Sequence, residues 1–197
     1  MPVSRYPRAV CVYCGSRSGG NPAWQAAAVE LGAGLAARGI GLVYGGGNIG
    51  LMRATADAAM AAGGRVVGVI PRDLEAREQG HRAVSELHVV KSMHERKLLM
   101  ANLSDAFVAL PGGLGTLDET FEILTWRQLR FHDKPIVLAD IAGYWQPLLD
   151  LVEAQIACGF VDPAHRALMT VANSVDGIFA ALEGAGDSAA GFAADKA

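Results

Sequence analysis

The residues 111–116, Pro-Gly-Gly-Leu-Gly-Thr, have the composition of an anion-binding loop. They follow an apolar run at residues 106–110 and precede a segment with helical character. Glycines expose backbone N–H groups and let a ligand come close, and the start of a helix adds partial positive charge. Thr116 adds a hydroxyl group. The loop lacks the Gly-Lys-Ser/Thr ending of a P-loop, so the pattern indicates a phosphate site but not ATP hydrolysis.

Two carboxylates, Asp118 and Glu119, follow this loop directly. One interpretation is structural, because Glu119 lies three residues after Thr116 and could close a capping box. The other is catalytic. Two carboxylates beside a phosphate site repel the phosphate, so we expect them there only if the reaction needs them. Hydrolysis of a glycosidic bond passes through a cation-like state, which a carboxylate stabilises while it orients a water molecule.

Arg96 and Lys97 form a second candidate pair. The residues 92–95, Ser-Met-His-Glu, are typical of a capping box, so both cations fall in the first turns of a helix. That end of a helix disfavours positive charge. The pair is therefore either a solvated surface pair or a functional pair aimed at a phosphate or a base. His94 is interpreted as a packing or surface residue, and Glu95 as the cap.

The residues 45–50, Gly-Gly-Gly-Asn-Ile-Gly, match G-x-G-x-x-G after a predicted strand. This pattern resembles a dinucleotide fingerprint, but it follows the second strand, and no acidic residue ends the next one. We therefore favour a tight turn with close helix packing. Two other interpretations of this loop remain: contact with a nucleotide phosphate or sugar, and, less favoured, NAD binding.

Short apolar runs alternate with helical stretches, and they must position these groups. Strands are predicted at 9–14, 41–44, 65–70, 87–90, 106–110, 135–139 and 167–172, and 73–83 is predicted as a loop. Helices are predicted at 22–38, 49–62, from 92, and at 116–131, 145–158 and 174–182. Continuous apolar strands separated by helices predict a three-layer α/β sandwich with a mostly parallel sheet. Ligands bind such sheets at the carboxyl ends of the strands.

Composition sets the protein class. The 197 residues are 51% hydrophobic and 19% charged, with a net charge of −3. We expect a single domain over 1–183 and a flexible, Gly/Ala-rich tail at 184–197. Nothing indicates binding to nucleic acid. No signal core or membrane-length apolar run occurs, so we expect a cytoplasmic protein that does not bind membranes.

Three cysteines, Cys11, Cys14 and Cys158, do not form a disulfide framework, so a reducing compartment is expected. Cys11 and Cys14 match C-x-x-C, but no second pair or histidine pair accompanies them. They also lie in a strand-like apolar run. We therefore expect buried structural cysteines and no metal site.

The paired motifs at 93–97 and 111–119, with their spacing, resemble the Lonely Guy family of cytokinin-activating phosphoribohydrolases. The segments 45–52 and 124–129 also match, and the likeness extends over residues 8–182. It implies a Rossmann-like fold, no cofactor, and a homodimer with the site near its interface. The implied reaction converts cytokinin riboside 5′-monophosphates, and often AMP, to the free base and ribose 5-phosphate.

Carried onto this chain, the resemblance implies that Arg96 and Glu119 are the catalytic pair. It implies substrate contacts at Glu78, Lys97, Gly112, Gly113, Leu114, Gly115, Thr116, Leu117, Asp118 and Thr125. The chain departs from the family pattern at Leu114, often tyrosine, and at Asp118, often glutamate. Relatives also carry a lysine decarboxylase label, but none of the four lysines here lies in a recognisable pyridoxal phosphate setting.

Three alternatives remain open at this point. One is a nucleotide- or cofactor-binding carrier without chemistry, resembling the molybdenum-cofactor carriers, which have a similar glycine loop. The second is an NAD(P)-binding oxidoreductase that uses the 45–50 loop. The third is an AMP nucleosidase outside hormone metabolism, which shares the chemistry and differs in the base accepted.

Overall fold

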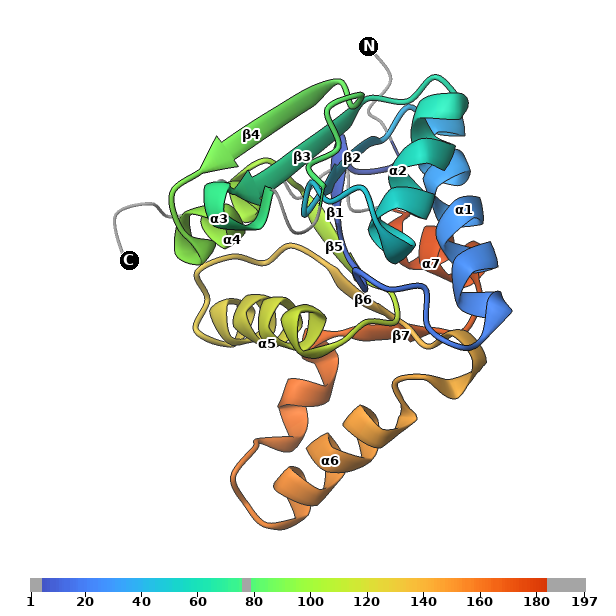
Figure 1. The fold of residues 1–197 in the computed structure, drawn as a ribbon. Coiled ribbons are helices and arrows are strands. Elements are labelled where there is room, and N and C mark those ends of the chain that lie inside the picture. Colours follow the sequence, from blue (N-terminus) through green and yellow to red (C-terminus); the bar gives the residue numbers. More distant parts are fainter. Residues whose placement is uncertain (1–4, 76–78, 184–197) are drawn as a thin grey trace.

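A computed structural model describes residues 5–75 and 79–183 of the chain (Figure 1). Seven parallel strands form one sheet in the order β4-β3-β2-β1-β5-β6-β7. The strands are β1 Ala9–Tyr13, β2 Gly41–Tyr44, β3 Val66–Pro71, β4 Glu86–Val90, β5 Ala106–Ala109, β6 Ile136–Ala139 and β7 Thr170–Ala172. The central strand β1 pairs with β2 on one side and with β5 on the other, so that Val10 lies between Leu42 and Ala106.

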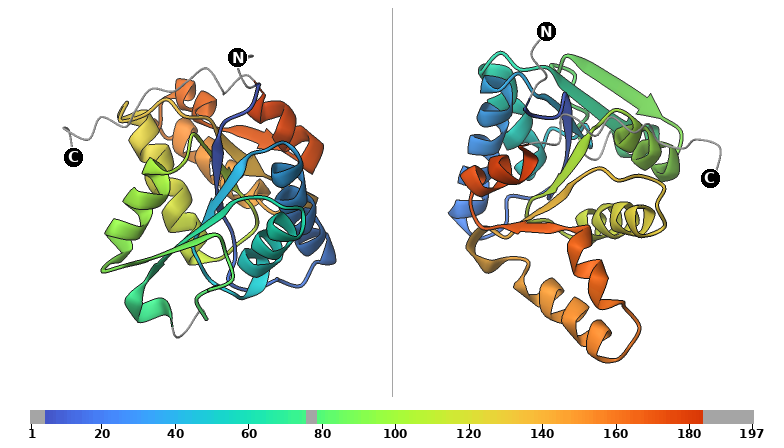
Figure 2. Two further views of the ribbon diagram at one scale, coloured as in Figure 1. Left: turned by 90° about the horizontal axis from the view of Figure 1, so that it is seen from above. Right: turned by 180° about the vertical axis from the view of Figure 1, so that it is seen from behind.

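Helices connect the strands and cover both faces of the sheet (Figures 1 and 2). They are α1 Pro22–Ala37, α2 Gly50–Ala61, α3 Arg72–Glu75, α4 Met93–Asn102, α5 Leu114–Gln128, α6 Gln146–Ala157 and α7 Val175–Leu182. Two 3₁₀ helices, η1 Ile141–Gly143 and η2 Pro163–Leu168, flank α6. Asn21 caps α1 as predicted, accepting a hydrogen bond from the Ala23 N–H at 3.0 Å.

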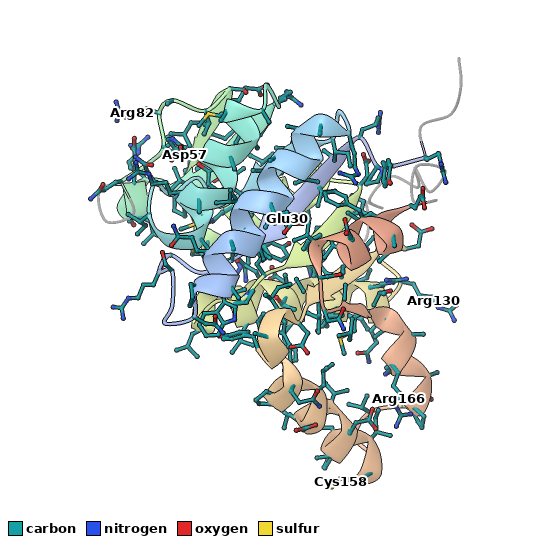
Figure 3. All side chains as sticks on the ribbon, turned by 90° about the vertical axis from the view of Figure 1, so that its right-hand side faces the viewer. Glu30, Asp57, Arg82, Arg130, Cys158 and Arg166 are labelled. Carbon is teal, nitrogen blue, oxygen red and sulfur yellow. The ribbon has the colours of Figure 1, made fainter. Side chains whose placement is uncertain are left out.

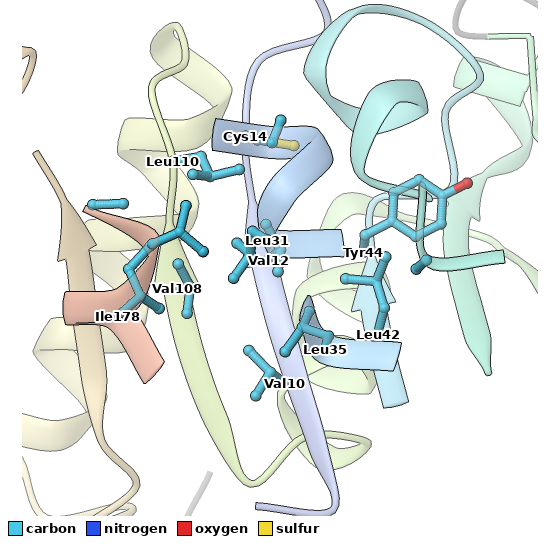
Figure 4. Packing of buried hydrophobic residues seen from close by; sticks show 14 of the residues in the cluster. Val10, Val12, Cys14, Leu31, Leu35, Leu42, Tyr44, Val108, Leu110 and Ile178 are labelled. Carbon is cyan, nitrogen blue, oxygen red and sulfur yellow. The ribbon is translucent and has the colours of Figure 1, made fainter. Parts of the chain in front are cut away.

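The alternation of side chains along β1 builds the two layers of the core. Val10, Val12 and Cys14 pack on one face with side chains of α1, α2 and α7 (Figure 4). Cys11 and Tyr13 pack on the other face with side chains of α4 and α5. Because successive residues of a strand point to opposite faces, one apolar run supplies both cores. The predicted three-layer α/β fold with a parallel sheet is confirmed.

This alternation also separates the two cysteines of the C-x-x-C pattern. Cys11 and Cys14 are buried, free thiols that belong to different core clusters. Their predicted burial is confirmed. Cys158, by contrast, is exposed near the end of α6, which projects from the body of the fold (Figure 3).

Several element boundaries differ from the predicted ones. The short helix α3 lies in the segment predicted as a loop, and β7 begins at Thr170 because η2 occupies the residues before it. Phe121 on α5 is 40% exposed. Glu78 and the tail at 184–197 lie outside the described residues. No helix in the described part of the chain is long and apolar enough to cross a membrane.

The topology fixes where a ligand can bind. The connection after β1 leads to β2 on one side of the sheet, whereas β5 pairs with β1 on the other side. The loops that follow β1 and β5 therefore diverge at the carboxyl edge and leave a crevice between them, which is the usual ligand position in open α/β sheets.

Candidate active site

A cavity of about 160 Å³ occupies this crevice. Its walls come from the carboxyl end of β1, the start of the loop after β2, the helices α2 and α4, and the first turns of α5. The lining residues are Val12, Cys14, Gly15, Ser16, Gly45, Met52, Arg96, Gly113, Leu114, Gly115, Thr116 and Glu119. The cavity thus brings the predicted catalytic pair together with four residues of the predicted phosphate loop.

The glycine loop after β5 ends in a helix N-terminus that faces the cavity. Gly113 is the N-cap of α5, and no side chain of a described residue caps the helix. The first N–H groups of a helix lack partners within the helix, so those of 114–116 are available to an anion. A Cβ added to Gly113 or Gly115 would meet no atom within 4 Å. The backbone is therefore open where a phosphate would approach.

Gly112 has a different function in the same loop. A Cβ at this position would lie 2.1 Å from Thr116 Oγ1 and 2.8 Å from the Gly15 nitrogen. Gly15 N–H in turn donates to Pro111 O at 3.0 Å. Where they leave the sheet, before they diverge, the loops after β1 and β5 are therefore packed backbone to backbone, and only glycine fits at their contact.

Glu119 lies on the buried stripe of α5, together with Thr116, Thr120 and Ile123. The helix begins at Leu114, two residues earlier than predicted, so Thr116 lies within the first turn. Thr116 is therefore not an N-cap residue, and the capping-box interpretation of Glu119 is wrong. The Glu119 side chain is 9% exposed and lines the cavity.

Arg96 is buried and held by backbone carbonyl groups. Its Nε donates to Val69 O at 3.1 Å and its Nη2 to Gly45 O at 2.7 Å. Its Nη1 lies 3.8 Å from Glu119 Oε1. The alternative of a solvated pair is therefore wrong for Arg96. The bonds fix the guanidinium plane, so that one edge faces Glu119 across the cavity.

Lys97 is also buried, but its side chain points to a different set of partners. Its Nζ lies 3.0 Å from Asp118 Oδ2 and 3.0 Å from Glu122 Oε1. Burial lowers the pKa of Lys97, but the hydrogen bonds to Asp118 and Glu122 outweigh burial and raise it overall. Lys97 therefore stays cationic and links α4 to α5.

The structure places Leu117, Asp118 and Thr125 outside the lining of this cavity, whereas Leu114 is part of the lining. Leu117 packs against the small apolar cluster around β6 and α6. Asp118 is occupied by Lys97. Thr125 is exposed and donates to Phe121 O at 2.7 Å. Leu114 lines the cavity and is 85% exposed.

The 45–50 loop is explained by packing against protein groups. A Cβ at Gly45 would lie 2.1 Å from Arg96 Nη2, and one at Gly50 would lie 2.3 Å from the carbonyl carbon of Ser16. Gly46 and Gly50 also have positive φ values of 74° and 58°. The predicted tight turn and close packing thus account for these glycines, and one of them, Gly45, makes room for the Arg96 side chain.

Several lining residues were not predicted as site residues. Cys14, Gly15 and Ser16 follow β1, a position that the carboxyl-edge rule indicated without identifying residues. A second cavity of about 520 Å³ adjoins the first and shares Gly15, Ser16, Gly113 and Leu114 with it. Trp24 and Tyr144 line it, and the Tyr144 hydroxyl donates to Gly112 O.

The fold and the site together define a class of protein. It is a Rossmann-like α/β protein whose switch-point cavity combines an open helix N-terminus with a buried arginine and a buried carboxylate. Comparison with known proteins narrows this class. A family model described as "Possible lysine decarboxylase" matches residues 52–182.

The relatives include plant and bacterial proteins. One is the probable cytokinin riboside 5′-monophosphate phosphoribohydrolase LOGL9 of Oryza sativa, 49% identical over 91% of this chain and 79% of its own. Another is the cytokinin riboside 5′-monophosphate phosphoribohydrolase of Rhodococcoides fascians, 45% identical over 89% of each chain. The chain belongs to the Lonely Guy family of cytokinin riboside 5′-monophosphate phosphoribohydrolases.

Solved structures with the same fold include a protein with a different described role. The molybdenum cofactor carrier protein of Chlamydomonas reinhardtii is 27% identical, with a TM-score of 0.67 over 88% of this chain and 94% of its own. The molybdenum cofactor binding protein of Rippkaea orientalis shares the fold at 22% identity, with a TM-score of 0.65 over 87% of this chain and 93% of its own.

Proposed function

We propose that this protein hydrolyses the N-glycosidic bond of cytokinin riboside 5′-monophosphates, and also of AMP, to the free base and ribose 5-phosphate. Family membership supports this proposal, and the observation that carries it is the placement of Arg96 and Glu119. Their side chains lie 3.8 Å apart in one small cavity, next to an open helix N-terminus.

The 5′-phosphate docks on the N–H groups at the start of α5, near Gly113, Gly115 and Thr116. The partial charge of the helix and the open space at both glycines support this docking. The phosphate binding energy holds the ribose over the first turns of α5, and this orientation brings C1′ toward Glu119.

Glu119 acts on the reacting carbon. As the C1′–N bond breaks, its electron pair leaves with the base and positive charge develops on the ribose. The Glu119 carboxylate stabilises this charge and orients a water molecule, whose hydroxyl adds to C1′ while the base takes up a proton. Burial strengthens the interaction, because little solvent screens a side chain that is 9% exposed.

Arg96 remains charged throughout, since a guanidinium does not lose its proton in a protein. Its Nε and Nη2 are bonded to Val69 O and Gly45 O, so the group is held in place before substrate binds. We infer that its remaining edge stabilises negative charge on the departing base, as a preorganised donor does.

The remaining site residues that the resemblance implies stay proposals. They are the binding residues Glu78, Lys97, Gly112, Leu114, Leu117, Asp118 and Thr125. We also propose a cytoplasmic homodimer with the site near its interface. The exposed side chains of Leu98 on α4, of Phe121 on α5 and of Leu129, which caps the end of α5, support an interface there, since these helices carry the proposed catalytic pair. Light scattering of the purified chain tests the dimer.

A carrier without chemistry is the second candidate, and the likeness to the Chlamydomonas carrier protein supports it. The test incubates the pure protein with AMP and, separately, with isopentenyladenosine 5′-monophosphate, and it resolves base and ribose 5-phosphate by chromatography. We expect equal amounts of both products, and no release from the corresponding nucleosides. Binding of either nucleotide without product would favour the carrier.

A further inference from the structure

A charged cluster lies beside Glu119 on α5. Lys97 Nζ lies 3.0 Å from Asp118 Oδ2 and 3.0 Å from Glu122 Oε1. These two carboxylates flank Glu119 in the sequence, one residue before it and three residues after it. The sequence motifs give Glu122 no function, and the structure places it in the same ion-pair cluster as Lys97.

The spacing of these carboxylates would be unfavourable without Lys97. Asp118 and Glu122 are four residues apart on one helix, where like charges repel, and Glu119 lies between them. Each negative neighbour disfavours the ionised form of Glu119. The side chains of Lys97 and Glu119 are only 8% and 9% exposed and that of Glu122 is 25% exposed, so solvent screens their interactions weakly. Asp118 is 54% exposed, so its effect on Glu119 is weaker.

The two neighbouring cations of α4 therefore differ in function. Arg96 faces Glu119 in the cavity, whereas Lys97 contacts the carboxylates on both sides of it. Two cations then oppose three carboxylates, and the cluster keeps one net negative charge. A single negative charge suits a reaction in which the ribose becomes cationic.

We propose that Lys97 is a positioning residue, which keeps Glu119 ionised and directed into the cavity by balancing the negative charges of Asp118 and Glu122. This proposal rests on the proposed function, which gives Glu119 its part in the reaction. The substrate contact that the resemblance implies for Lys97 is a separate prediction, and the test below distinguishes the two.

The groups around Glu119 come from three elements. The groups on α4 and α5 are charged, whereas those on β1 are buried acids that remain neutral. Burial raises the pKa of the Cys11 thiol and of the Tyr13 phenol, and the negative charge of Glu119 raises both further. The set is Arg96 and Lys97 on α4, Asp118 and Glu122 on α5, and Cys11 and Tyr13 on β1.

The first arm of the test measures the titration of the Glu119 carboxyl by ¹³C NMR, with Glu119→Gln used to assign the signal. In Lys97→Met we expect the midpoint to rise by about one pH unit, because two carboxylates lose their counter-ion. In Glu122→Gln we expect the midpoint to fall, because Glu119 loses a negative neighbour while Lys97 keeps its charge. The double variant should return toward the wild-type value.

The second arm measures base release against pH. The acidic limb should move with the NMR midpoint in each variant, and Lys97→Arg should restore it. The matched control is Arg166→Met, which removes an ion pair with Glu153 at 2.7 Å on the projecting segment and should leave both readouts unchanged (Figure 3).

The two arms separate the possible failures. A raised KM in Lys97→Met with an unchanged midpoint, or an unchanged midpoint in folded Glu122→Gln, would overturn the positioning role. If the wild-type protein releases no base, the proposed function fails. The NMR arm still decides whether Lys97 and Glu122 control the charge of Glu119.

Discussion

The guanidinium of Arg96 donates a hydrogen bond from Nη2 to the carbonyl oxygen of Gly45 at 2.7 Å. A Cβ on Gly45 would lie 2.1 Å from that same nitrogen atom. The glycine loop after β2 and Arg96 of α4 therefore form one packed unit, although Gly45 and Arg96 lie 51 residues apart in sequence.

Gly45→Ala should displace Arg96 and impair catalysis without removing any side chain that contacts substrate. We expect kcat to fall by about 10²-fold, as for a displaced electrostatic group. Steady-state base release checks this expectation. The matched control is Gly20→Ala, where a Cβ would meet no atom within 4 Å, and its kcat should equal that of the wild type. Equal rates for both variants would contradict the function we assign to this contact.

Gly113→Ala tests the phosphate site. The added methyl group meets no protein atom within 4 Å, so the melting temperature should stay at the wild-type value. The methyl group would, however, occupy the space where a phosphate approaches the start of α5. We expect the KM for AMP and the inhibition constant of ribose 5-phosphate both to rise about tenfold or more. Unchanged values would place the phosphate elsewhere.

His132 should make the protein sensitive to acid. Burial lowers the pKa of His132 from 6.5 to about 4. Below pH 6.5 the unfolded chain binds a proton at His132 that the folded protein does not accept until about pH 4. The free energy of unfolding therefore decreases as the pH is lowered from 6.5 to about 4.

The contribution of His132 amounts to roughly 3 kcal/mol at the acidic end of the window. His132→Gln should lose less stability than the wild type between pH 7.5 and pH 4.5, as measured by urea unfolding. If both proteins lost the same amount, acid sensitivity would arise from other groups.

Lys134 should stabilise α4, the helix that carries Arg96. Its buried Nζ donates to Ala101 O at 2.9 Å and to Ser104 O at 2.7 Å, at the C-terminal end of α4. Lys134→Met leaves both carbonyl groups without this donor and should lower the free energy of unfolding by about 2–4 kcal/mol. Urea denaturation measures it. A variant as stable as the wild type would show that α4 needs no such cap.

The sequence predicted the architecture well for a physical reason. Strands such as β1 are apolar on both faces, and the helices between them carry clear start signals, such as Asn21 before α1 and Ser92 before α4. Element ends were less predictable: the glycine loop after β5 contains no side-chain cap, so the true start of α5 at Leu114 had no sequence signal.

The site was predicted in part. Motifs identified Arg96 and Glu119, but spacing alone left a solvated pair and a helix cap as alternatives. The helical spacing of apolar residues would have excluded both alternatives. Arg96 lies four residues before Met100, and Glu119 four residues before Ile123, so each lies on the buried face of its helix. Ser16 lines the cavity because β1 and β5 are neighbours in the sheet, and this strand order cannot be predicted from local sequence patterns.

The most direct test of the account is the rate of base release by Glu119→Gln in a single turnover with AMP. The substitution keeps the shape of the side chain but removes its charge, so the fold and nucleotide binding should persist while the rate falls by about 10³-fold or more. A rate near that of the wild type, with the variant folded and binding AMP, would contradict the assignment of Glu119 as the catalytic carboxylate.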